Sequence, residues 1–533
     1  MRALRAGTDA VLVDVADLET ALALTSSLRD QLPDGVVEVI PAARTVLLRF
    51  DPTVTTARRL ADEVRSRPRG RDAPPPAGEP LEIPVVYDGA DLAEVAQWCG
   101  LSPADVVARH TQAVYTVAFT GFAPGFAYLS GGDPVLRVPR RASPRTSIPA
   151  GSVAIAGEFS GVYPRSSPGG WRLLGRTDVD LFDVDRDPPA LLQPGGRVRF
   201  VAVEELPGRR VIATGLGPAS RWRTADRQAS GDVPGPGLEV TAVAGQALLQ
   251  DLGRDGVARL GLASSGAMDR GALRRANRRV GNPPQAAAIE VALGGLTLRA
   301  RGDLVVAVAG ARVPLTVEGR QVPSDRAVAV DDGEEIRLGP PETGVYTYLA
   351  LRGGFDLSPV LGSAARDVLA AVGPEPLAAG DVLAAGGRRA DAVPLPEPEP
   401  VLPGTHETTT VDVVLGPRAD WFSSGALAVL TGQTWTVLPE SNRIGRRLTG
   451  ERALTRVAEG ELASEPTGRG ALQVPPEGRP VLLAADHPVT GGYPVIAHVA
   501  AHDLDLAMQV PPGASIRFRA VDLAQDAEAE EER

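Results

Sequence analysis

The chain has 533 residues, too many for one hydrophobic core, and its length suggests about three or four domains. Hydrophobic residues make up 43% of it and charged residues 23%, as in ordinary globular proteins. The net charge of −11 argues against binding to duplex nucleic acid, because such a protein needs a basic face to displace counterions.

All 55 basic residues are arginines, so the chain contains no lysine. This excludes a P-loop lysine on a phosphate, a Schiff-base lysine and a biotinylated lysine. The phosphates of a bound nucleotide would have to meet arginines, backbone N–H groups or a metal ion. We therefore expect no covalently bound biotin.

The first predicted unit is a small α/β cap over residues 1–68, with the order β-α-β-β-α. A proline-rich linker over residues 70–80 follows it. The expected elements of the cap are a strand at Asp9–Val15, a helix at Asp17–Leu32, a hairpin of Val36–Ile40 with Thr45–Phe50, and a helix at Thr55–Arg65.

Residues 81–205 are predicted to form a second unit of short strands and Gly/Pro turns, introduced by two short helices. The second helix has a clear start, with Ser102 as N-cap, Pro103 at the first helical position and Asp105 at the third. The one cysteine, Cys99, is interpreted as a buried helical thiol. A single cysteine permits neither an intrachain disulfide nor a CxxC metal site.

Four further ranges complete the expected organisation: a linker over 206–237, β modules over 238–390 and 411–522, and a solvated acidic tail over 523–533. No run of residues is apolar for long enough to span a bilayer. We therefore expect no membrane partner and a cytoplasmic location. The predicted fold class is mainly β, with a small α/β domain at the N-terminus.

Short motifs recur in the same order in two of the β modules, which suggests related β-barrels. The predicted pairs are GSVAIA (151–156) with GALQVP (470–475), GGW (169–171) with GGY (491–493), and PGGRVRF (194–200) with PGASIRF (512–518). In the β module over 238–390, DGEEIRL (332–338) has the same outline as the PGGRVRF and PGASIRF pair.

Familiar catalytic motifs such as GxSxG, HExxH and GxxxxGK[ST] are absent from the sequence. The chain has five histidines, and none has the spacing of a convincing metal site. His498 and His502 are four residues apart, but they flank a predicted strand end. We predict no metal site built from protein ligands.

Two segments dense in glycine, arginine and aromatic residues lie in the second unit. The first, FTGFAPGFAY (119–128), predicts a rigid bent loop, and Arg140, Arg141 and Arg145 follow it closely. Rigidly placed arginines suit a carboxylate or a phosphate. The second, YPRSSPGGWRLLGRT (163–177), predicts a glycine turn whose N–H groups can bind an anion. An aromatic-packed turn and a β-turn with surface arginines remain open as structural interpretations.

Two comparable segments lie in the later modules. In residues 250–282, Met268, Ala272, Ala276 and Val280 share one predicted helical face, and Gly281 stands where a C-terminal glycine belongs. A helix N-terminus there favours an anion, although an acid in its first turn can also be purely structural. The other segment joins SNRIGRRL (441–448) to DHPVTGGYP (486–494), and a solvated turn is the alternative.

Together these segments resemble one known family. GFAPGFAYLSG, PRRASPR, PAGSVAIAG and SPGGWRLLGRT are similar to the B subunit of bacterial ATP-dependent 5-oxoprolinase, also called KipI-like or carboxyltransferase-domain subunit 1. QDLGRDG, SSGAMDRGALRRANRRVGN, SNRIGRRL, GALQVPPEG and TGGYPVIAHV are similar to the C subunit of that enzyme, also called KipA-like or carboxyltransferase-domain subunit 2. The resemblance covers nearly the whole chain, in the order B then C.

The resemblance implies tandem cyclophilin-like β-barrels, one in the B-like part and two in the C-like part, besides the cap. It implies ATP-driven opening of 5-oxoproline to glutamate, with ATP and its magnesium ion as cofactor. It also implies a separate partner, a LamB/YcsF-type A subunit that hydrolyses the activated lactam. Phosphoryl transfer needs positioning and charge neutralisation more than a nucleophilic side chain, so arginines and glycine turns suit it.

Three residues are the predicted catalytic groups: Arg443, Asp486 and Asp269. The predicted substrate- or nucleotide-binding residues are Phe122, Pro124, Gly125, Arg140, Arg145, Gly169, Gly170, Trp171, Gln250, Asp251, Arg254, Ser265, Asn277, Arg447, Thr490, Gly491, Gly492 and Tyr493.

Three departures from the family pattern put the substrate in question more than the fold. Phe159-Ser160 stands where Gln-Thr is common, Asn442 where Asp is usual, and His487-Pro488 where Arg-Gln is usual. Two other functions therefore stay open. The same domain pair occurs in the biotin-dependent urea carboxylases, and KipI/KipA-like pairs also regulate a histidine kinase.

Overall fold

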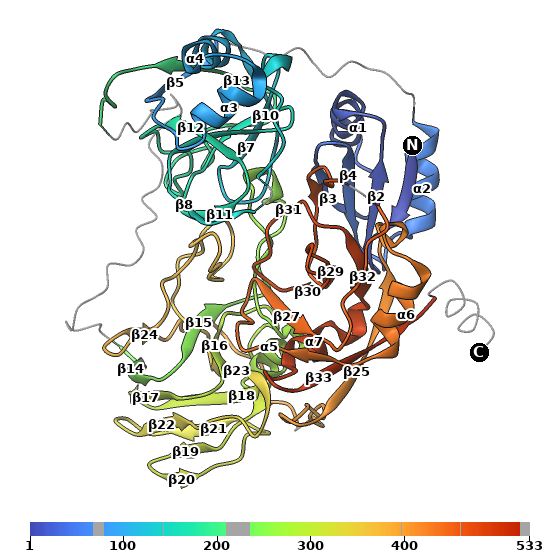
Figure 1. Ribbon diagram of the computed structural model, residues 1–533. Coiled ribbons are helices and arrows are strands. Elements are labelled where there is room, and N and C mark those ends of the chain that lie inside the picture. The colour runs from blue at the N-terminus through green and yellow to red at the C-terminus, as the bar shows by residue number, and fades with distance from the viewer. Residues whose placement is uncertain (68–78, 142, 209–234, 396, 459, 523–533) are drawn as a thin grey trace.

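The structure is a computed structural model that describes residues 1–67, 79–141, 143–208, 235–395, 397–458 and 460–522. Strands dominate it, and the mainly β fold class is confirmed. Figure 1 shows four bodies: the cap, a first barrel, a middle module and a last barrel. The expected acidic tail and most of the expected linker after the first barrel lie outside the described residues.

The cap is a four-stranded sheet of order β1-β2-β4-β3, with α1 against β3 and β4 and α2 against β2. Side-chain caps start both helices, because Asp17 accepts from Thr20 N and Thr56 accepts from Arg59 N. The edge strand β1 was missing from the sequence prediction. The elements are β1 (Arg2–Arg5), β2 (Ala10–Asp14), α1 (Leu18–Asp30), β3 (Val36–Pro41), β4 (Thr45–Phe50) and α2 (Ala57–Ser66).

The first barrel is a seven-stranded sheet of order β12-β9-β10-β7-β6-β13-β5, and a bridge from Val86 to Arg176 joins its two ends. The predicted capping box of Ser102 and Asp105 starts α4. Cys99 ends α3 and is half-buried. The elements are β5 (Leu81–Val85), α3 (Leu92–Cys99), α4 (Pro103–Gln112), β6 (Tyr115–Thr120), β7 (Ala127–Ser130), η1 (Pro134–Leu136), β8 (Arg145–Ile148), β9 (Ser152–Ala156), β10 (Phe159–Val162), β11 (Ser167–Gly169), β12 (Arg172–Arg176) and β13 (Arg197–Ala202).

The middle module has two sheets, of orders β20-β19-β22-β17-β14-β24 and β15-β16-β23-β18-β21, which enclose one apolar core. The predicted helix is α5, which packs on β18 and β23 and is followed by Gly281 at φ 72°. The elements are β14 (Gly237–Val243), β15 (Gln246–Gln250), η2 (Ala258–Leu260), α5 (Arg270–Arg279), β16 (Ala288–Ala292), β17 (Leu296–Arg301), β18 (Leu304–Arg312), β19 (Leu315–Val317), β20 (Arg320–Gln321), β21 (Val328–Val330), β22 (Glu335–Leu338), β23 (Thr343–Leu351) and β24 (Val382–Ala384).

The last barrel is closed, in the order β25-β32-β29-β30-β27-β26-β33, and its core merges with the side of the middle module that carries α5. The elements are β25 (Thr408–Leu415), η3 (Ala419–Trp421), α6 (Ser424–Gly432), β26 (Trp435–Val437), β27 (Gly445–Thr449), β28 (Glu465–Pro466), β29 (Ala471–Gln473), β30 (Val481–Leu483), β31 (Thr490–Gly491), β32 (Val495–Val499), α7 (Ala501–Gln509) and β33 (Ser515–Ala520).

The first and last barrels share one strand order, which confirms that they are related. Strands β5, β13, β6, β7, β10, β9 and β12 follow each other around the first barrel as β25, β33, β26, β27, β30, β29 and β32 do around the last. Both final strands run parallel to the opening strand. The small ribbons β8–β11 and β28–β31 also correspond. Each predicted motif pair falls on equivalent strands.

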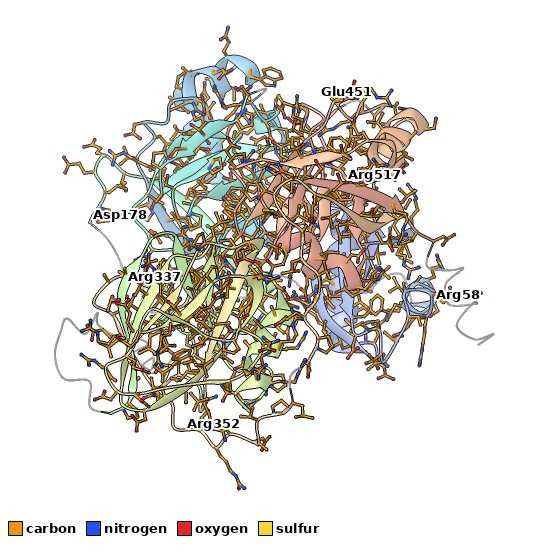
Figure 2. The ribbon with its side chains drawn as sticks, turned by 90° about the horizontal axis from the view of Figure 1, so that it is seen from below. Arg58, Asp178, Arg337, Arg352, Glu451 and Arg517 are labelled. Carbon is orange, nitrogen blue, oxygen red and sulfur yellow. The ribbon has the colours of Figure 1, made fainter. Side chains whose placement is uncertain are left out.

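Charged side chains project outward from several parts of the molecule. Arg58, Arg337 and Arg517 are exposed and are labelled in Figure 2. Among the described residues, no helix combines the length and the apolar character needed to cross a membrane.

Candidate functional site

The four glycine- and arginine-rich segments meet where the first barrel, the middle module and the last barrel join. The β6–β7 loop of the first barrel approaches β31 of the last barrel so closely that a Cβ on Gly121 would lie 2.4 Å from Thr490 Oγ1. The same loop contacts the middle module, where Gly125 N donates to Leu260 O over 3.0 Å. We call this junction the seam.

Polar side chains cross the seam between the first and last barrels. Tyr128 Oη lies 3.3 Å from Thr490 Oγ1 and accepts from Ser464 Oγ at 3.2 Å. Arg140 Nη2 donates to the same Ser464 Oγ over 3.0 Å. A Cβ on Gly492 would meet Arg140 Nη1 at 2.4 Å, so the guanidinium lies directly against that glycine. The structure thus brings together three of the predicted binding residues, Arg140, Thr490 and Gly492.

The remaining predicted residues of the first barrel build the wall behind the seam. Phe122 has a positive φ of 66° and packs edge-on against Phe126, which packs edge-on against Trp171. Gly169 lies against Tyr163, because an added Cβ would be 2.3 Å from its hydroxyl oxygen. Pro124, Gly125 and Gly170 belong to the turns of the same wall, and Gly491 and Tyr493 to the facing turn of the last barrel.

Arg145 is paired with an acid of its own barrel. Its Nη1 and Nη2 donate to both oxygens of the buried Asp91 carboxylate, each at 2.8 Å. Burial opposes ionisation of Asp91, but hydrogen bonds from Arg145 and Leu173 N outweigh it and lower the pKa. The predicted anion-binding arginine is therefore already neutralised by a side chain of the same barrel.

The predicted residues of the middle module are held by backbone groups. Gln250 Nε2 donates to Arg366 O at 2.8 Å, and Arg254 Nη2 donates to Ala365 O at 2.6 Å. Asp251 accepts from Gly253 N, Ser363 Oγ and Ala364 N. Asn277 Nδ2 donates to Leu273 O and Ala286 O. These contacts hold the loops around the four side chains in shape.

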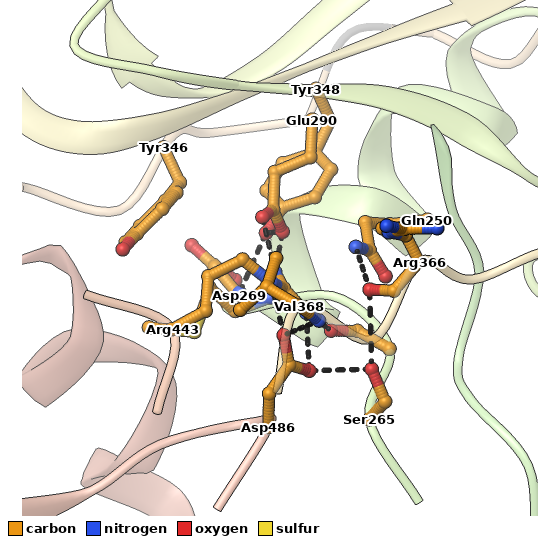
Figure 3. A network of polar contacts seen from close by, with 12 residues as sticks. Gln250, Ser265, Asp269, Glu290, Tyr346, Tyr348, Arg366, Val368, Arg443 and Asp486 are labelled. Atoms are coloured by element: carbon orange, nitrogen blue, oxygen red, sulfur yellow. Dashed lines mark hydrogen bonds and ion pairs between the residues drawn. The ribbon is translucent and has the colours of Figure 1, made fainter. Parts of the chain in front are cut away.

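Arg443 and Asp486 form the centre of a sealed network, shown in Figure 3. Arg443 Nε and Nη2 donate to the two Asp486 oxygens at 2.9 and 3.0 Å, and Nη1 pairs with Glu290. Ser265 Oγ donates to Asp486 Oδ1 at 2.5 Å. Arg443 is 1% exposed and Asp486 0%. Through Glu290 and Ser265 the network joins the last barrel to the middle module. Its sealed geometry fits a role in positioning the two bodies rather than contact with substrate.

Asp269, the third predicted catalytic residue, is the N-cap of α5. Its Oδ1 accepts from Ala272 N at 2.7 Å and its Oδ2 from Gln509 Nε2 at 2.9 Å. Burial, followed by the negative charge of Asp505, raises its pKa to about 6. The purely structural alternative given for this acid is therefore the one that its contacts support. Arg447 is exposed.

The side chains next in sequence to these buried groups line a cavity of about 110 Å³. His487 follows Asp486, Arg270 follows Asp269, Ser264 precedes Ser265 and Val489 precedes Thr490. The cap supplies Ala6–Ala10, Leu12, Glu38, Ile40, Leu47 and Arg49 to the same cavity, and the last barrel supplies Arg469 and His498. Three bodies of the fold therefore meet around it.

The cavity is rich in arginine and neutral histidine. Burial, followed by the positive charges of Arg469 and Arg49, lowers the pKa of Arg270 to about 9. Burial lowers the pKa of His487 and of His498 to about 4, so both imidazoles are neutral near pH 7. Sequence reasoning missed these three arginines and two histidines as site residues. Arg49 comes from the cap, Arg270 from the middle module and Arg469 from the last barrel, so they become neighbours only in the folded chain.

Among the described residues, one grouping has the composition of a metal site: Asp412, His502 and Asp503. Arg519 already donates to both oxygens of Asp412, at 2.6 and 2.9 Å. Asp503 accepts from Asp412 N at 2.7 Å. This grouping is an arginine-neutralised cluster, and none of its three residues is part of the cavity lining.

Comparison with known proteins divides the chain as the fold does. Residues 1–192 match the carboxyltransferase domain, subdomains C and D, and residues 260–520 match the carboxyltransferase domain, subdomains A and B. The chain is 43% identical over 201 residues to the B subunit of 5-oxoprolinase from Escherichia coli O157:H7, covering 36% of this chain and 92% of that protein. It is 34% identical over 296 residues to the C subunit of 5-oxoprolinase from Haemophilus influenzae, covering 54% and 93%.

Solved structures and longer enzymes match as well. The crystal structure of TTHA0988 is 36% identical, with a TM-score of 0.82 over 97% of this chain and 100% of that chain. Urea amidolyase of Saccharomyces cerevisiae is 32% identical over 301 residues, but these span 53% of this chain and only 16% of that protein. The chain therefore belongs to the carboxyltransferase-domain family that contains the B and C subunits of 5-oxoprolinase, with the B-like and C-like parts joined in one polypeptide.

Proposed function

We propose that the chain is the fused B–C component of an ATP-dependent 5-oxoprolinase, which activates 5-oxoproline for ring opening to L-glutamate. The observation that carries this proposal is the joining of a B-like part and a C-like part that pack against each other across the seam. Most of the length of the B and C relatives is represented in order, whereas the urea amidolyase relatives are far longer.

The proposed chemistry needs an activated lactam. The lactam oxygen attacks the γ-phosphorus of ATP, a new O–P bond forms, the bond to the β-phosphate oxygen breaks, and ADP leaves. A separate LamB/YcsF-type A subunit then adds water to the activated carbon, the bond from that carbon to the phosphate oxygen and the ring C–N bond break, and inorganic phosphate and glutamate leave. Neither of these two steps requires a lysine or a covalent biotin. This agrees with the sequence, which has no lysine and therefore no site for biotin attachment.

ATP and Mg²⁺ enter this proposal as the source of the phosphoryl group and its counterion. The cavity of about 110 Å³ fits one small organic acid better than a whole nucleotide, since pockets for drug-sized ligands span about 300–1,000 Å³. We therefore assign it no nucleotide-binding role. A cytoplasmic location follows from the same proposal, because the substrate and ATP are both available there.

The decisive experiment measures ADP release by the purified chain mixed with the A subunit, with and without 5-oxoproline. The proposal expects ATP turnover and glutamate formation only when all three are present. ATP turnover that does not depend on 5-oxoproline would refute the proposal. Urea-dependent turnover with a biotin carboxylase and its carrier protein would instead favour the carboxyltransferase function, and binding to a histidine kinase without ATP turnover would favour regulation.

A further inference from the structure

The cavity beneath the cap is lined by residues with buried hydrogen-bonding atoms that have no partner among the described residues. Arg270 Nε, Arg469 Nε and His498 Nδ1 are buried and make no hydrogen bond within the described protein. All three residues line this one cavity. Buried polar atoms in native proteins are almost always paired, so these three atoms are hydrogen-bonding groups that a ligand in this space can use.

Arg270 is the cation of this cavity without a carboxylate partner among the described residues. Its one side-chain hydrogen bond is a long one, 3.5 Å from Nη2 to Ser265 O. The other acids nearby are already engaged: Glu38 pairs with Arg49 at 3.2 Å, and Glu465 pairs with Arg418. Asp505 accepts from Arg270 N and Gly271 N at the start of α5, while Asp9 and Asp255 are exposed.

Arg469 lines the same space from the last barrel. Its Nη2 donates to Met268 O at 2.6 Å and lies 3.4 Å from Asp505, and its side chain is 9% exposed. Two guanidinium groups with free Nε–H donors suit a single carboxylate, which accepts hydrogen bonds on two oxygens.

His487 adds an acceptor to these donors. Its Nδ1 lies 2.9 Å from Pro488 O, so Nδ1 carries the proton and Nε2 keeps its lone pair in the neutral ring. A ligand N–H can therefore donate to His487 Nε2. The rest of the lining is largely aliphatic, with Leu12, Ile40, Leu47 and Leu504, and suits a short carbon ring.

We propose that this cavity binds a small cyclic amide acid, with its carboxylate between Arg270 and Arg469 and its amide N–H on His487 Nε2. The identity of the ligand rests on the proposed function: it is 5-oxoproline, and the cap forms part of its binding site. A phosphate shares the anionic chemistry, but it has neither the amide N–H nor the carbon ring that the other side of the cavity suits.

Isothermal titration calorimetry on the full chain, with neither ATP nor the A subunit present, tests this. 5-Oxoproline should bind, 2-pyrrolidinone should not because it lacks the carboxylate, and cyclopentanecarboxylate should bind at least about tenfold more weakly because it lacks the amide. Arg270→Gln should weaken 5-oxoproline binding at least about tenfold, and Arg270→Lys should recover part of it. The control Arg274→Gln, on the exposed side of the same helix, should bind as the wild type does.

Unchanged 5-oxoproline binding in Arg270→Gln would overturn the assignment, as would inorganic phosphate displacing 5-oxoproline at equal concentration. Thermal unfolding provides a second check, because Arg270 has no carboxylate partner to lose among the described residues: Arg270→Gln should be at least as stable as the wild type. Failure of the proposed function alone gives a different result. 5-Oxoproline would then bind, and Arg270→Gln would weaken that binding, but ATP turnover would not depend on 5-oxoproline.

Discussion

Replacing Arg443 with methionine should destabilise the protein strongly. Arg443 makes two hydrogen bonds to Asp486, one to Glu290 and one to Gly266 O, and the two carboxylates are 0% and 2% exposed. Methionine fills much of the space but leaves two buried charges without a cation. Removing one partner of a buried ion pair costs about 3–5 kcal/mol, and two stranded carboxylates place this variant at the upper end.

The assay is guanidinium denaturation of the full chain, followed by tryptophan fluorescence, which reports on Trp435 in the core of the last barrel. Arg447→Met, an exposed change in the same segment, should stay within about 0.5 kcal/mol of the wild type. Adding Glu290→Gln to Arg443→Met should restore part of the loss, because it removes one of the stranded charges. A loss below about 1 kcal/mol for Arg443→Met would refute the reasoning.

Three other predictions concern the seam, a buried acid and the cofactor. Gly121→Ala should lower the melting temperature, because its Cβ would lie 2.4 Å from Thr490; Gly432→Ala, with open space around it, should not. Burial and the charge of Asp486 raise the pKa of Asp367 to about 7, so the folded state binds the extra proton and stability falls as pH rises from about 4 to 7. Asp367→Asn should flatten that decline in denaturation curves measured at pH 4.5 and 7.5, and an unchanged slope would contradict it. Chelation of Mg²⁺ should stop 5-oxoproline-dependent ADP release, and magnesium should restore it.

Local sequence signals predicted much of the fold. Periodicity and capping residues located α1, α2, α4 and α5 closely, and the ordered motif pairs indicated two related barrels. Strand β5 was missed because Pro84 interrupts its pattern, and proline is tolerated there only because the strand ends its sheet beside β13.

The site was harder to predict than the fold, for a physical reason. Glycine- and arginine-rich segments identified where the bodies meet, but not which side chain of each segment faces a cavity. In four places the neighbour of a predicted residue lines the cavity: Arg270 beside Asp269, His487 beside Asp486, Ser264 beside Ser265 and Val489 beside Thr490. A shift of one residue moves a side chain from a sealed network to an open space, and only packing decides between them.

Arg49 shows the other limit of sequence reasoning. It lies on β4 of the cap, far in sequence from Arg270 and Arg469, and no local pattern distinguishes it from other strand arginines. Its place beside them depends on how the cap docks onto the last barrel. That docking is supported by the ion pair of Arg418 with Asp14 of the cap and by Ala43 N donating to Ser464 O.

The measurement that tests the central claim most directly is steady-state ADP release by the chain together with the A subunit, titrated with 5-oxoproline. The account predicts that turnover rises and saturates with 5-oxoproline, that glutamate appears with it, and that omitting either protein abolishes both. Turnover that is the same with and without 5-oxoproline would contradict it.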